Sequence, residues 1–266
     1  MIERRLSARN PKLQRLRRLA HHRRDRWDER AFVLEGRHLV VDALDHGHPL
    51  EAVFVEARSD GRVDLDLDRA GAPVHEVEPG TLAKVVDAVT PQPLAAIARM
   101  PSMDEAVVEE VIDGRGMVVV LAGVTDPGNA GTMLRVAEAA EVGAVLFCDE
   151  AVDPFAPKCV RASAGSILHV PVTSGGRSVR LLEAIGGRGG RRIAAGAGRG
   201  DAYHRTDLTG PLALVFGSES HGVPAELEPV LDGWTHVPMA GRTESLNVGV
   251  TGAVVCFEAA RQRGQA

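Results

Sequence analysis

Three segments of this 266-residue chain combine glycine with polar side chains of the kind that contact ligands. They span residues 125–135 (TDPGNAGTMLR), 216–224 (FGSESHGVP) and 237–248 (VPMAGRTESLNV). Glycine has no side chain, so backbone amides and carbonyls in such segments can approach a ligand closely. Each segment follows a predicted strand, and ligands of parallel α/β sheets bind at the carboxyl ends of the strands. Together the three segments predict one binding site.

Alternating strand and helix patterns position these segments. Apolar runs at 117–123, 144–148, 193–195 and 212–216 predict buried strands, and 235–237 predicts another. Helices are predicted over 130–141, with Asn129 near the N-cap, and over 247–261. This alternation predicts an α/β fold in which helices cover both faces of a parallel sheet.

The last predicted helix is apolar on nearly every side, through residues such as Val250, Val254 and Phe257. A helix of this kind must be buried on more than one side. Gly249 and Gly252 would allow another backbone to approach closely. The pattern leaves two alternatives open, a core helix of a monomer and a helix with one face in a subunit interface.

The first hundred residues predict a small α/β module. Its expected elements are a basic helix within 7–30, a strand entering a helix at 32–44, strands at 52–55 and 74–77, a helical piece at 81–86 and an apolar run at 94–98. The acidic segment 101–115 is bounded by turn formers and predicts a linker. The predicted organisation is a domain over 1–100, a linker over 101–115 and a second domain over 116–266.

The charge is distributed unevenly along the chain. The net charge is −5, yet residues 1–30 contain 11 Arg and Lys against 4 Asp and Glu. A basic segment on an acidic body is an electrostatic footprint for phosphate, which suggests a nucleic-acid partner. A solvated surface helix is the alternative interpretation.

The composition argues against several other classes of protein. No apolar run reaches the roughly 18 residues that a membrane helix needs, and the N-terminus lacks the apolar stretch of a secretion signal. The three cysteines lack CxxC spacing, which disfavours a zinc site and suits a reducing cytoplasm. The cluster GAGRG at 196–200 lacks the GxGxxG spacing of dinucleotide-binding enzymes. We expect a cytoplasmic protein without metal or membrane contact.

The three segments, in this order and spacing, resemble the sequence motifs of the SpoU (TrmH-like) RNA 2′-O-methyltransferases of the SPOUT superfamily. The matching positions are Asn129 and Arg135 in the first segment, Gly217, Glu219 and Gly222 in the second, and Ser245, Leu246 and Asn247 in the third. The intervening stretch PFAPKCVRASAGSILHVPV also resembles the family. In the N-terminal half, FVLEGRHLVVDAL and TPQPLAAIA are similar to its ribosomal-protein-like substrate-binding domain.

This resemblance implies a deep trefoil knot in the C-terminal domain, a homodimer, and S-adenosyl-L-methionine as the cofactor. The implied cofactor-binding residues are Gly196, Gly217, Val237, Met239, Leu246 and Val248. RNA is the implied partner, and its expected contacts are Arg9, Lys12, Arg15, Arg37, Lys158 and Arg161.

The implied activity is methyl transfer to a ribose 2′-hydroxyl, with 23S ribosomal RNA expected ahead of transfer RNA. A non-catalytic RNA-binding or assembly factor is the other alternative. The implied catalytic residues are Arg135, Asn129, Glu219, Ser245 and Asn247. A guanidinium stays protonated, so we expect Arg135 to stabilise a developing alkoxide or bind a phosphate. Asn129 is expected to orient Arg135 or the ribose, and Glu219 to pair with Arg135 or the cationic cofactor. Ser245 and Asn247 are expected to cap the last helix and contact a ligand.

Overall fold

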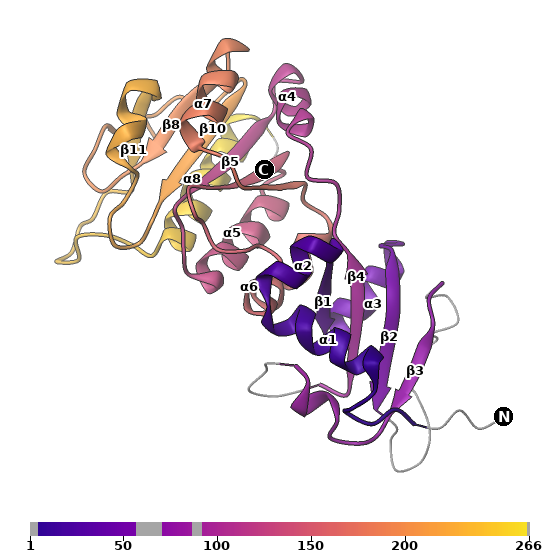
Figure 1. Ribbon diagram of the computed structural model, residues 1–266. Helices are drawn as coiled ribbons and strands as arrows, with labels where there is room; N and C mark the ends of the chain where they lie inside the picture. Colours follow the sequence, from indigo (N-terminus) through magenta and orange to yellow (C-terminus); the bar gives the residue numbers. More distant parts are fainter. Residues whose placement is uncertain (1–4, 57–70, 87–91, 265–266) are drawn as a thin grey trace. The chain divides into compact units, whose positions relative to one another are not determined.

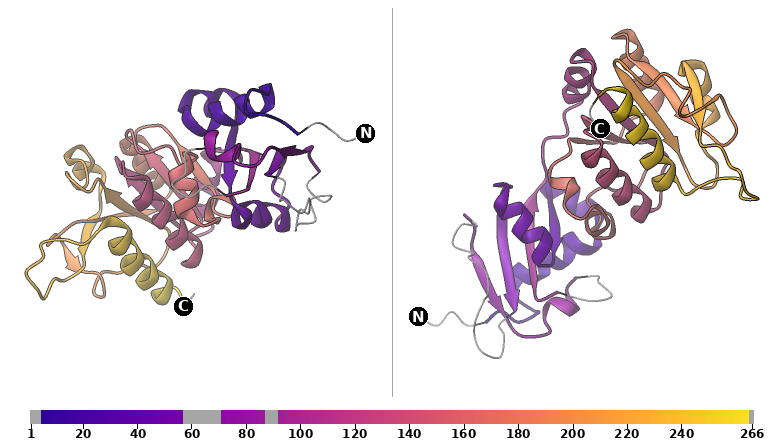
Figure 2. Two further views of the ribbon diagram at one scale, coloured as in Figure 1. Left: turned by 90° about the horizontal axis from the view of Figure 1, so that it is seen from below. Right: turned by 180° about the vertical axis from the view of Figure 1, so that it is seen from behind.

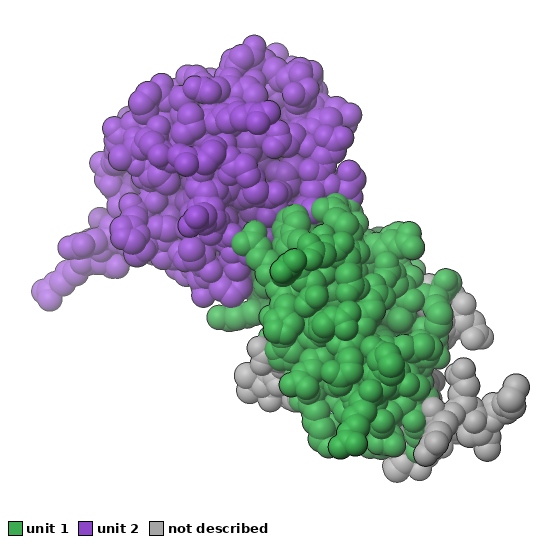
Figure 3. Space-filling model, viewed as in Figure 1, with its two compact units in different colours: residues 1–101, 155–168 green, residues 102–154, 169–266 purple. Residues whose placement is uncertain are grey.

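A computed structural model describes residues 5–56, 71–86 and 92–264. The chain forms two compact units, coloured separately in Figure 3. The first unit contains residues 1–101 and 155–168, and the second contains residues 102–154 and 169–266. The segment 155–168, which the sequence assigns to the C-terminal domain, thus belongs to the first unit. Arg4 of the basic N-terminal segment and Thr90 and Pro91 of TPQPLAAIA lie outside the described residues.

The second unit is built on a seven-stranded parallel sheet of order β7-β6-β5-β10-β8-β11-β9. Figure 1 labels β5, β8, β10 and β11 of this sheet. The strands are β5 (Met117–Ala122), β6 (Ala144–Cys148), β7 (Val172–Ser174), β8 (Arg191–Ala195), β9 (Asp201–Ala202), β10 (Leu212–Gly217) and β11 (Gly233–His236). The neighbouring strands β5 and β10 are buried along their whole length. The predicted parallel sheet is confirmed. It also contains β7 and β9, which the sequence did not predict.

Helices cover both faces of this sheet, as predicted. One face carries α4 (Ala106–Asp113), α7 (Ser178–Gly187) and the 3-10 segment η4 (Ala225–Val230), whose apolar side chains share one core cluster with β5, β6 and β10. The helices α5 (Pro127–Ala139) and α8 (Val248–Gln262) pack together on the other face, where the right-hand view of Figure 2 shows them side by side. Among the described residues, no helix has the length and apolar character to cross a membrane.

Helix α4 lies inside the segment that the sequence predicts as a linker. Val108 and Ile112 are buried in the core of the second unit. Their i, i+4 spacing places both side chains on one face of the helix. The segment therefore contributes a structural helix to the second unit, and only its beginning is irregular.

Two glycines allow α8 to approach α5. A Cβ atom at Gly252 would overlap the sulfur of Met133, whose side chain is fully buried. A Cβ atom at Gly249 would lie 2.9 Å from Cγ2 of Thr132. The close approach expected from these glycines is present, and it brings together the N-terminal turns of the two helices.

The first unit contains a four-stranded sheet of order β1-β4-β2-β3. Its elements are β1 (Ala31–Glu35), β2 (Leu50–Glu56), β3 (Val74–Val77), β4 (Leu94–Arg99), α1 (Pro11–His21), α2 (Arg23–Glu29), α3 (Arg37–Asp45), η2 (Leu82–Lys84), α6 (Pro157–Ser163) and η3 (Ser166–Leu168). The basic N-terminal segment forms α1 and α2, and Leu13, Leu16 and Leu19 of α1 are fully buried in the core of the unit. The segment is therefore an integral part of the fold.

Aromatic packing ties the segment 155–168 to the first unit. The ring of Phe155 is fully buried, with its centroid 5.0 Å from that of Phe32 and 6.3 Å from that of Trp27. Arg161 of α6 donates to Oε2 of Glu35 at 2.9 Å, and the Glu35 side chain is almost completely buried. A buried carboxylate needs such a partner because an isolated charge is costly to remove from water.

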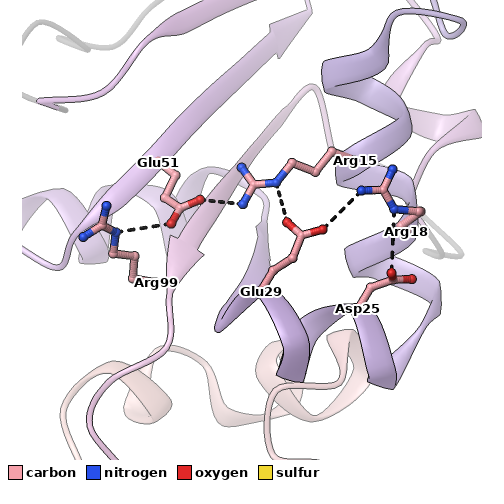
Figure 4. A network of polar contacts seen from close by, with 6 residues as sticks. All are labelled: Arg15, Arg18, Asp25, Glu29, Glu51 and Arg99. Atoms are coloured by element: carbon pink, nitrogen blue, oxygen red, sulfur yellow. Dashed lines mark hydrogen bonds and ion pairs between the residues drawn. The ribbon is translucent and has the colours of Figure 1, made fainter.

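An ion-pair network joins α1 and α2 to the sheet of the first unit (Figure 4). Arg15 lies 2.6 Å from Glu29 of α2 and 2.6 Å from Glu51 of β2, and Arg18 also donates to Glu29, at 3.1 Å. Burial opposes ionisation of Glu29, but the hydrogen bonds from the two arginines outweigh it and hold the pKa of Glu29 below its ordinary value. The guanidinium of Arg15 is therefore engaged within the fold.

Candidate functional site

A cavity of about 1090 Å³ lies where several loops leave the carboxyl edge of the seven-stranded sheet. Its wall is formed by the ends of three strands and the loops after them: residues 195–198 at β8, residues 216–219 and 222 at β10, and residues 236–239 and 241–247 at β11, together with Val248 and Thr251 of α8. Two of the three glycine-rich segments thus line one cavity. All six residues predicted to bind the cofactor belong to its wall, namely Gly196, Gly217, Val237, Met239, Leu246 and Val248.

The remaining glycine-rich segment joins the other two through one side-chain amide. Nδ2 of Asn129, in the first turn of α5, donates to Oε1 of Glu219 at 2.6 Å. Oδ1 of the same amide accepts from Nδ2 of Asn247 at 2.7 Å. The three segments are therefore linked by hydrogen bonds, and Glu219 and Asn247 also line the cavity.

Asn247 is the N-cap of α8. Its Oδ1 atom accepts from the backbone amides of Gly249 at 2.8 Å and Val250 at 3.4 Å, two of the donors that a helix start leaves unpaired. Ser245 does not cap the helix, contrary to the prediction. Its carbonyl accepts from the Thr243 hydroxyl at 3.2 Å, within a loop that lines the cavity.

The N-cap of α5 is Asp126, where the sequence analysis places Asn129. Oδ1 of Asp126 accepts from the backbone amide of Asn129 at 2.8 Å, and Pro127 follows at the first helical position. Proline fits there because its missing N–H would be unpaired in any case. This cap leaves the side chain of Asn129 free for its contacts with the other two segments.

The second segment is a tight loop that presents Glu219. The amide of Ser218 donates to the carbonyl of Gly222 at 3.0 Å, and the amide of Gly222 donates back at 2.8 Å. A Cβ atom at Gly217 would collide with the backbone of Gly222 and Val223, so only glycine fits at that position. The loop thus fixes a carboxylate near the start of α5.

A stacked pair of side chains supports the wall formed by residues 195–198. The guanidinium of Arg199 lies 3.5 Å from the ring centroid of Trp234 and donates to Glu228 at 2.9 Å. A Cβ atom at Gly196 would lie 2.8 Å from the Trp234 ring. The glycine therefore allows the cavity wall to rest directly on the indole.

Arg135 lies apart from the linked residues. It is an exposed residue of α5, six positions after Asn129, which places it about 120° around the helix. It has no hydrogen-bond or ion-pair partner within the described part of the chain, and it is not part of the cavity wall. Asn129 and Glu219 bind each other in this structure, and neither binds Arg135.

The predicted RNA contacts fall into three groups. Arg9 and Lys12 are exposed and have no side-chain partner among the described residues. Arg15 and Arg161 form ion pairs within the first unit. Arg37 and Lys158 are exposed at the starts of α3 and α6. Arg9 and Lys12 are thus the candidates that retain an uncompensated charge.

The cysteines are unsuited to nucleophilic chemistry. Cys148, Cys159 and Cys256 are all buried. Burial, with the negative charges of Asp149 and Glu105 adding to it, raises the pKa of Cys148 to about 12, and burial alone raises the pKa of Cys256 to about 12. These two thiols stay protonated at neutral pH.

Three further residues of the wall were not singled out from the sequence. They are His236, Arg242 and Glu244, which lie at the end of β11 and in the loop after it. The sequence alone could have indicated Arg242 and Glu244 as site candidates, because they are the charged residues within the third glycine-rich segment. His236 is the last residue of β11 and directly precedes the third segment, which begins at Val237.

Comparisons with known proteins identify the family of both halves of the chain. Residues 116–257 match the model of the SpoU rRNA Methylase family, and residues 10–96 match that of the MRM3-like substrate binding domain. The chain is 31% identical over 252 residues to the 23S rRNA (guanosine(2553)-2′-O)-methyltransferase RlmP of Bacillus subtilis, covering 94% of this chain and 96% of that one. It is 32% identical over 238 residues to the 23S rRNA (guanosine-2′-O-)-methyltransferase RlmB of Bordetella pertussis, covering 87% and 97%. Its fold is similar to that of an AdoMet-bound rRNA methyltransferase from Sinorhizobium meliloti, with a TM-score of 0.82, 27% identity and 97% of each chain covered.

Substitution of Asn247 should separate its two capping hydrogen bonds from its hydrogen bond to Asn129. Asn247→Ala removes the cap and the link to Asn129, and should lower the free energy of unfolding by about 1 to 2 kcal/mol. Asn247→Asp keeps an acceptor for the amides of Gly249 and Val250 but loses the donor to Asn129, so it should retain most of that stability. Urea unfolding of the two variants measures the difference. Equal losses in both would contradict the capping role.

Proposed function

Because the chain belongs to the SpoU rRNA methylase family, we propose that it transfers a methyl group from S-adenosyl-L-methionine to a ribose 2′-hydroxyl of ribosomal RNA, with 23S rRNA as the first candidate. One observation carries this proposal. Two of the three motif segments line one cavity, and the side-chain amide of Asn129 links the remaining segment to both of them. The substrate class is supported by relatives named as 23S rRNA 2′-O-methyltransferases, which match this chain over most of its length.

The cavity suits the proposed cofactor. Its volume of about 1090 Å³ lies just above the usual range of about 300 to 1,000 Å³ for small-molecule sites, and glycines at 196 and 217 leave backbone groups accessible in its wall. The wall also carries the carboxylates of Glu219 and Glu244, neither of which has a cationic partner among the described residues. Carboxylates favour a ligand that carries positive charge. When bound, S-adenosyl-L-methionine supplies a methyl carbon on a positively charged sulfur.

The protein's part in such a reaction is mainly to position the acceptor hydroxyl and exclude water, because sulfonium sulfur is already a good leaving group. The links between Asn129, Glu219 and Asn247 hold the cavity wall in one arrangement. We assign Arg135 to the acceptor side, where its permanent positive charge would stabilise a developing alkoxide or bind a neighbouring phosphate. Arg135 lies outside the cavity wall, so its contribution should be separable from cofactor binding.

Replacement of Arg135 tests this division of roles. Arg135→Ala should reduce methyl transfer to ribosomal RNA by about 100-fold or more, the usual effect of losing one group that stabilises developing negative charge. The dissociation constant for S-adenosyl-L-methionine, measured by calorimetry, should stay unchanged. Arg180→Ala, at another exposed arginine without a partner in the described chain, is the matched control.

Three outcomes would redirect the proposal. Undiminished methyl transfer by Arg135→Ala would remove this residue from the reaction. Methylation of transfer RNA in preference to ribosomal RNA would replace the substrate. A wild-type protein that binds RNA and never binds S-adenosyl-L-methionine would be a non-catalytic RNA-binding or assembly factor.

We also propose that the first unit contacts RNA through its unpaired cations. Residues 10–96 match a substrate-binding domain, and Arg9 and Lys12 lie at the start of α1 with no side-chain partner in the described chain. Arg37 and Lys158 are exposed but have contacts within the protein, so they stay secondary predictions. Arg15 and Arg161 would first have to leave their carboxylate partners, which makes them weaker candidates.

Loss of the two free cations should change the salt dependence of RNA binding. The double variant Arg9→Gln, Lys12→Gln should make the slope of log K against log salt shallower by about 1 to 2, since each phosphate contact contributes about 0.7 to 0.9. Removal of residues 1–30 would be uninformative because Leu13, Leu16 and Leu19 belong to the core. The pair Arg180→Gln, Arg205→Gln removes the same charge from the second unit and should leave the slope unchanged. An unchanged slope in the first variant would exclude these two contacts.

We further propose that the protein is a homodimer that uses α8. Val250 and Phe257, seven residues apart on this helix, are 48% and 44% exposed, and Leu246 just before it is 36% exposed. Large apolar side chains that share one helix face indicate a covering partner. Family resemblance supports a second copy as that partner. The trefoil knot and a cytoplasmic location stay predictions of the same resemblance.

The dimer proposal has a direct test. The double variant Val250→Glu, Phe257→Glu should sediment as a monomer at concentrations where the wild type is dimeric, because the new carboxylates would be buried without partners. Ala184→Glu, at an exposed position of α7, should leave the wild-type mass unchanged. A wild-type protein that is monomeric at these concentrations would overturn the proposal.

A further inference from the structure

The charged residues of the cavity wall carry more negative than positive charge. They are the carboxylates of Glu219 and Glu244 and the guanidinium of Arg242. His236 is the remaining titratable residue of the wall, and its Nδ1 lies 3.3 Å from the carbonyl of Arg199. Two acidic residues and one arginine therefore belong to the wall of the same cavity.

Arg242 is not neutralised by the protein. It is exposed and has no hydrogen-bond or ion-pair partner within the described part of the chain. Glu244 lies only two residues away in the same loop, yet the two side chains do not pair with each other. A nearby carboxylate would normally attract a guanidinium into a salt bridge, so both charges stay available to a ligand.

The proposed cofactor carries the complementary set of charges. S-adenosyl-L-methionine has a sulfonium and an ammonium, which are positive, and one carboxylate, which is negative. Removing a carboxylate from water is costly unless a partner compensates it. Among the described residues that line the cavity, Arg242 is the one permanent cation.

The other natural anion site at this cavity is already occupied. A helix N-terminus binds anions through its unpaired amides, and α8 begins in the cavity wall. The amides of Gly249 and Val250 are instead capped by Asn247. This cap leaves Arg242 as the main candidate for a carboxylate partner.

We propose that Arg242 binds the carboxylate of the methionine part of S-adenosyl-L-methionine. The inference rests on the proposed function, because it presupposes that this cofactor enters the cavity. Arg242 is thereby a binding residue that distinguishes the intact cofactor from analogues that lack the carboxylate. An RNA phosphate is the competing ligand for the same guanidinium, but its recognition would not require a place in the cavity wall.

The test compares two ligands that differ in the carboxylate alone, S-adenosyl-L-methionine and its decarboxylated form. Calorimetry gives the dissociation constant of each for the full-length wild type and for Arg242→Gln. We expect Arg242→Gln to weaken S-adenosyl-L-methionine by about 10-fold or more, the usual effect of losing a charge-assisted hydrogen bond. Its affinity for the decarboxylated form should stay within about twofold of wild type. Arg205→Gln, at an exposed arginine outside the cavity wall, should alter neither constant.

Other outcomes would overturn the inference in distinguishable ways. Equal weakening of both ligands by Arg242→Gln would show a general effect on the loop. Unchanged cofactor binding with weaker binding of ribosomal RNA would assign Arg242 to a phosphate. A wild-type protein that binds neither ligand would refute the proposed function itself, whatever the variant does.

Discussion

The site depends on one side-chain amide, that of Asn129, which joins three segments far apart in the sequence. Its nitrogen donates to Glu219, 90 residues away, and its oxygen accepts from Asn247, 118 residues away. An ionised carboxylate only accepts hydrogen bonds, so Glu219 requires the nitrogen of Asn129 to face it. The oxygen of Asn129 must then face Asn247, whose own oxygen is left to cap α8. The orientation of each amide is thereby fixed by its neighbour.

The packing of α5 against α8 makes this chain of hydrogen bonds possible. Glycines at 249 and 252 face Thr132 and Met133, and a Cβ atom at either position would require these side chains or the helices to shift. The separation of the helix starts sets the distance between Asn129 and Asn247. A small outward movement of α8 would break a 2.7 Å bond and release the loop that forms much of the cavity wall. Packing of the two helices and the shape of the binding site are therefore coupled.

Much of the second unit was predictable because its strands and loops are indicated by residues that are neighbours in the sequence. Continuous apolar runs identify β5, β6 and β10, and glycine with polar residues marks the loops after β10 and β11. Helix α4 is absent from the sequence prediction because the segment is acidic and bounded by turn formers. The helical i, i+4 spacing of Val108 and Ile112 is a weak pattern beside these residues. The α5 cap was misplaced by three residues, although the Asp-Pro pair at 126 and 127 is a readable start signal.

Contacts between distant residues could not be predicted in the same way. The sequence shows Arg15 and Arg161 as cations, and only the fold shows that Glu29, Glu51 and Glu35 neutralise them. The link between Asn129, Glu219 and Asn247 was likewise invisible, although each residue was singled out. Sequence patterns predicted candidate residues for the site, and the structure shows that hydrogen bonds of Asn129 join two of them, Glu219 and Asn247.

The most direct measurement of the central claim is the position of the transferred methyl group. Ribosomal RNA is incubated with the wild-type protein and S-adenosyl-L-methionine labelled in its methyl group, digested to nucleosides and analysed by mass spectrometry. The account predicts that the label appears in a 2′-O-methylated nucleoside. Label on a base, or no label while a known ribose methyltransferase modifies the same RNA, would contradict it.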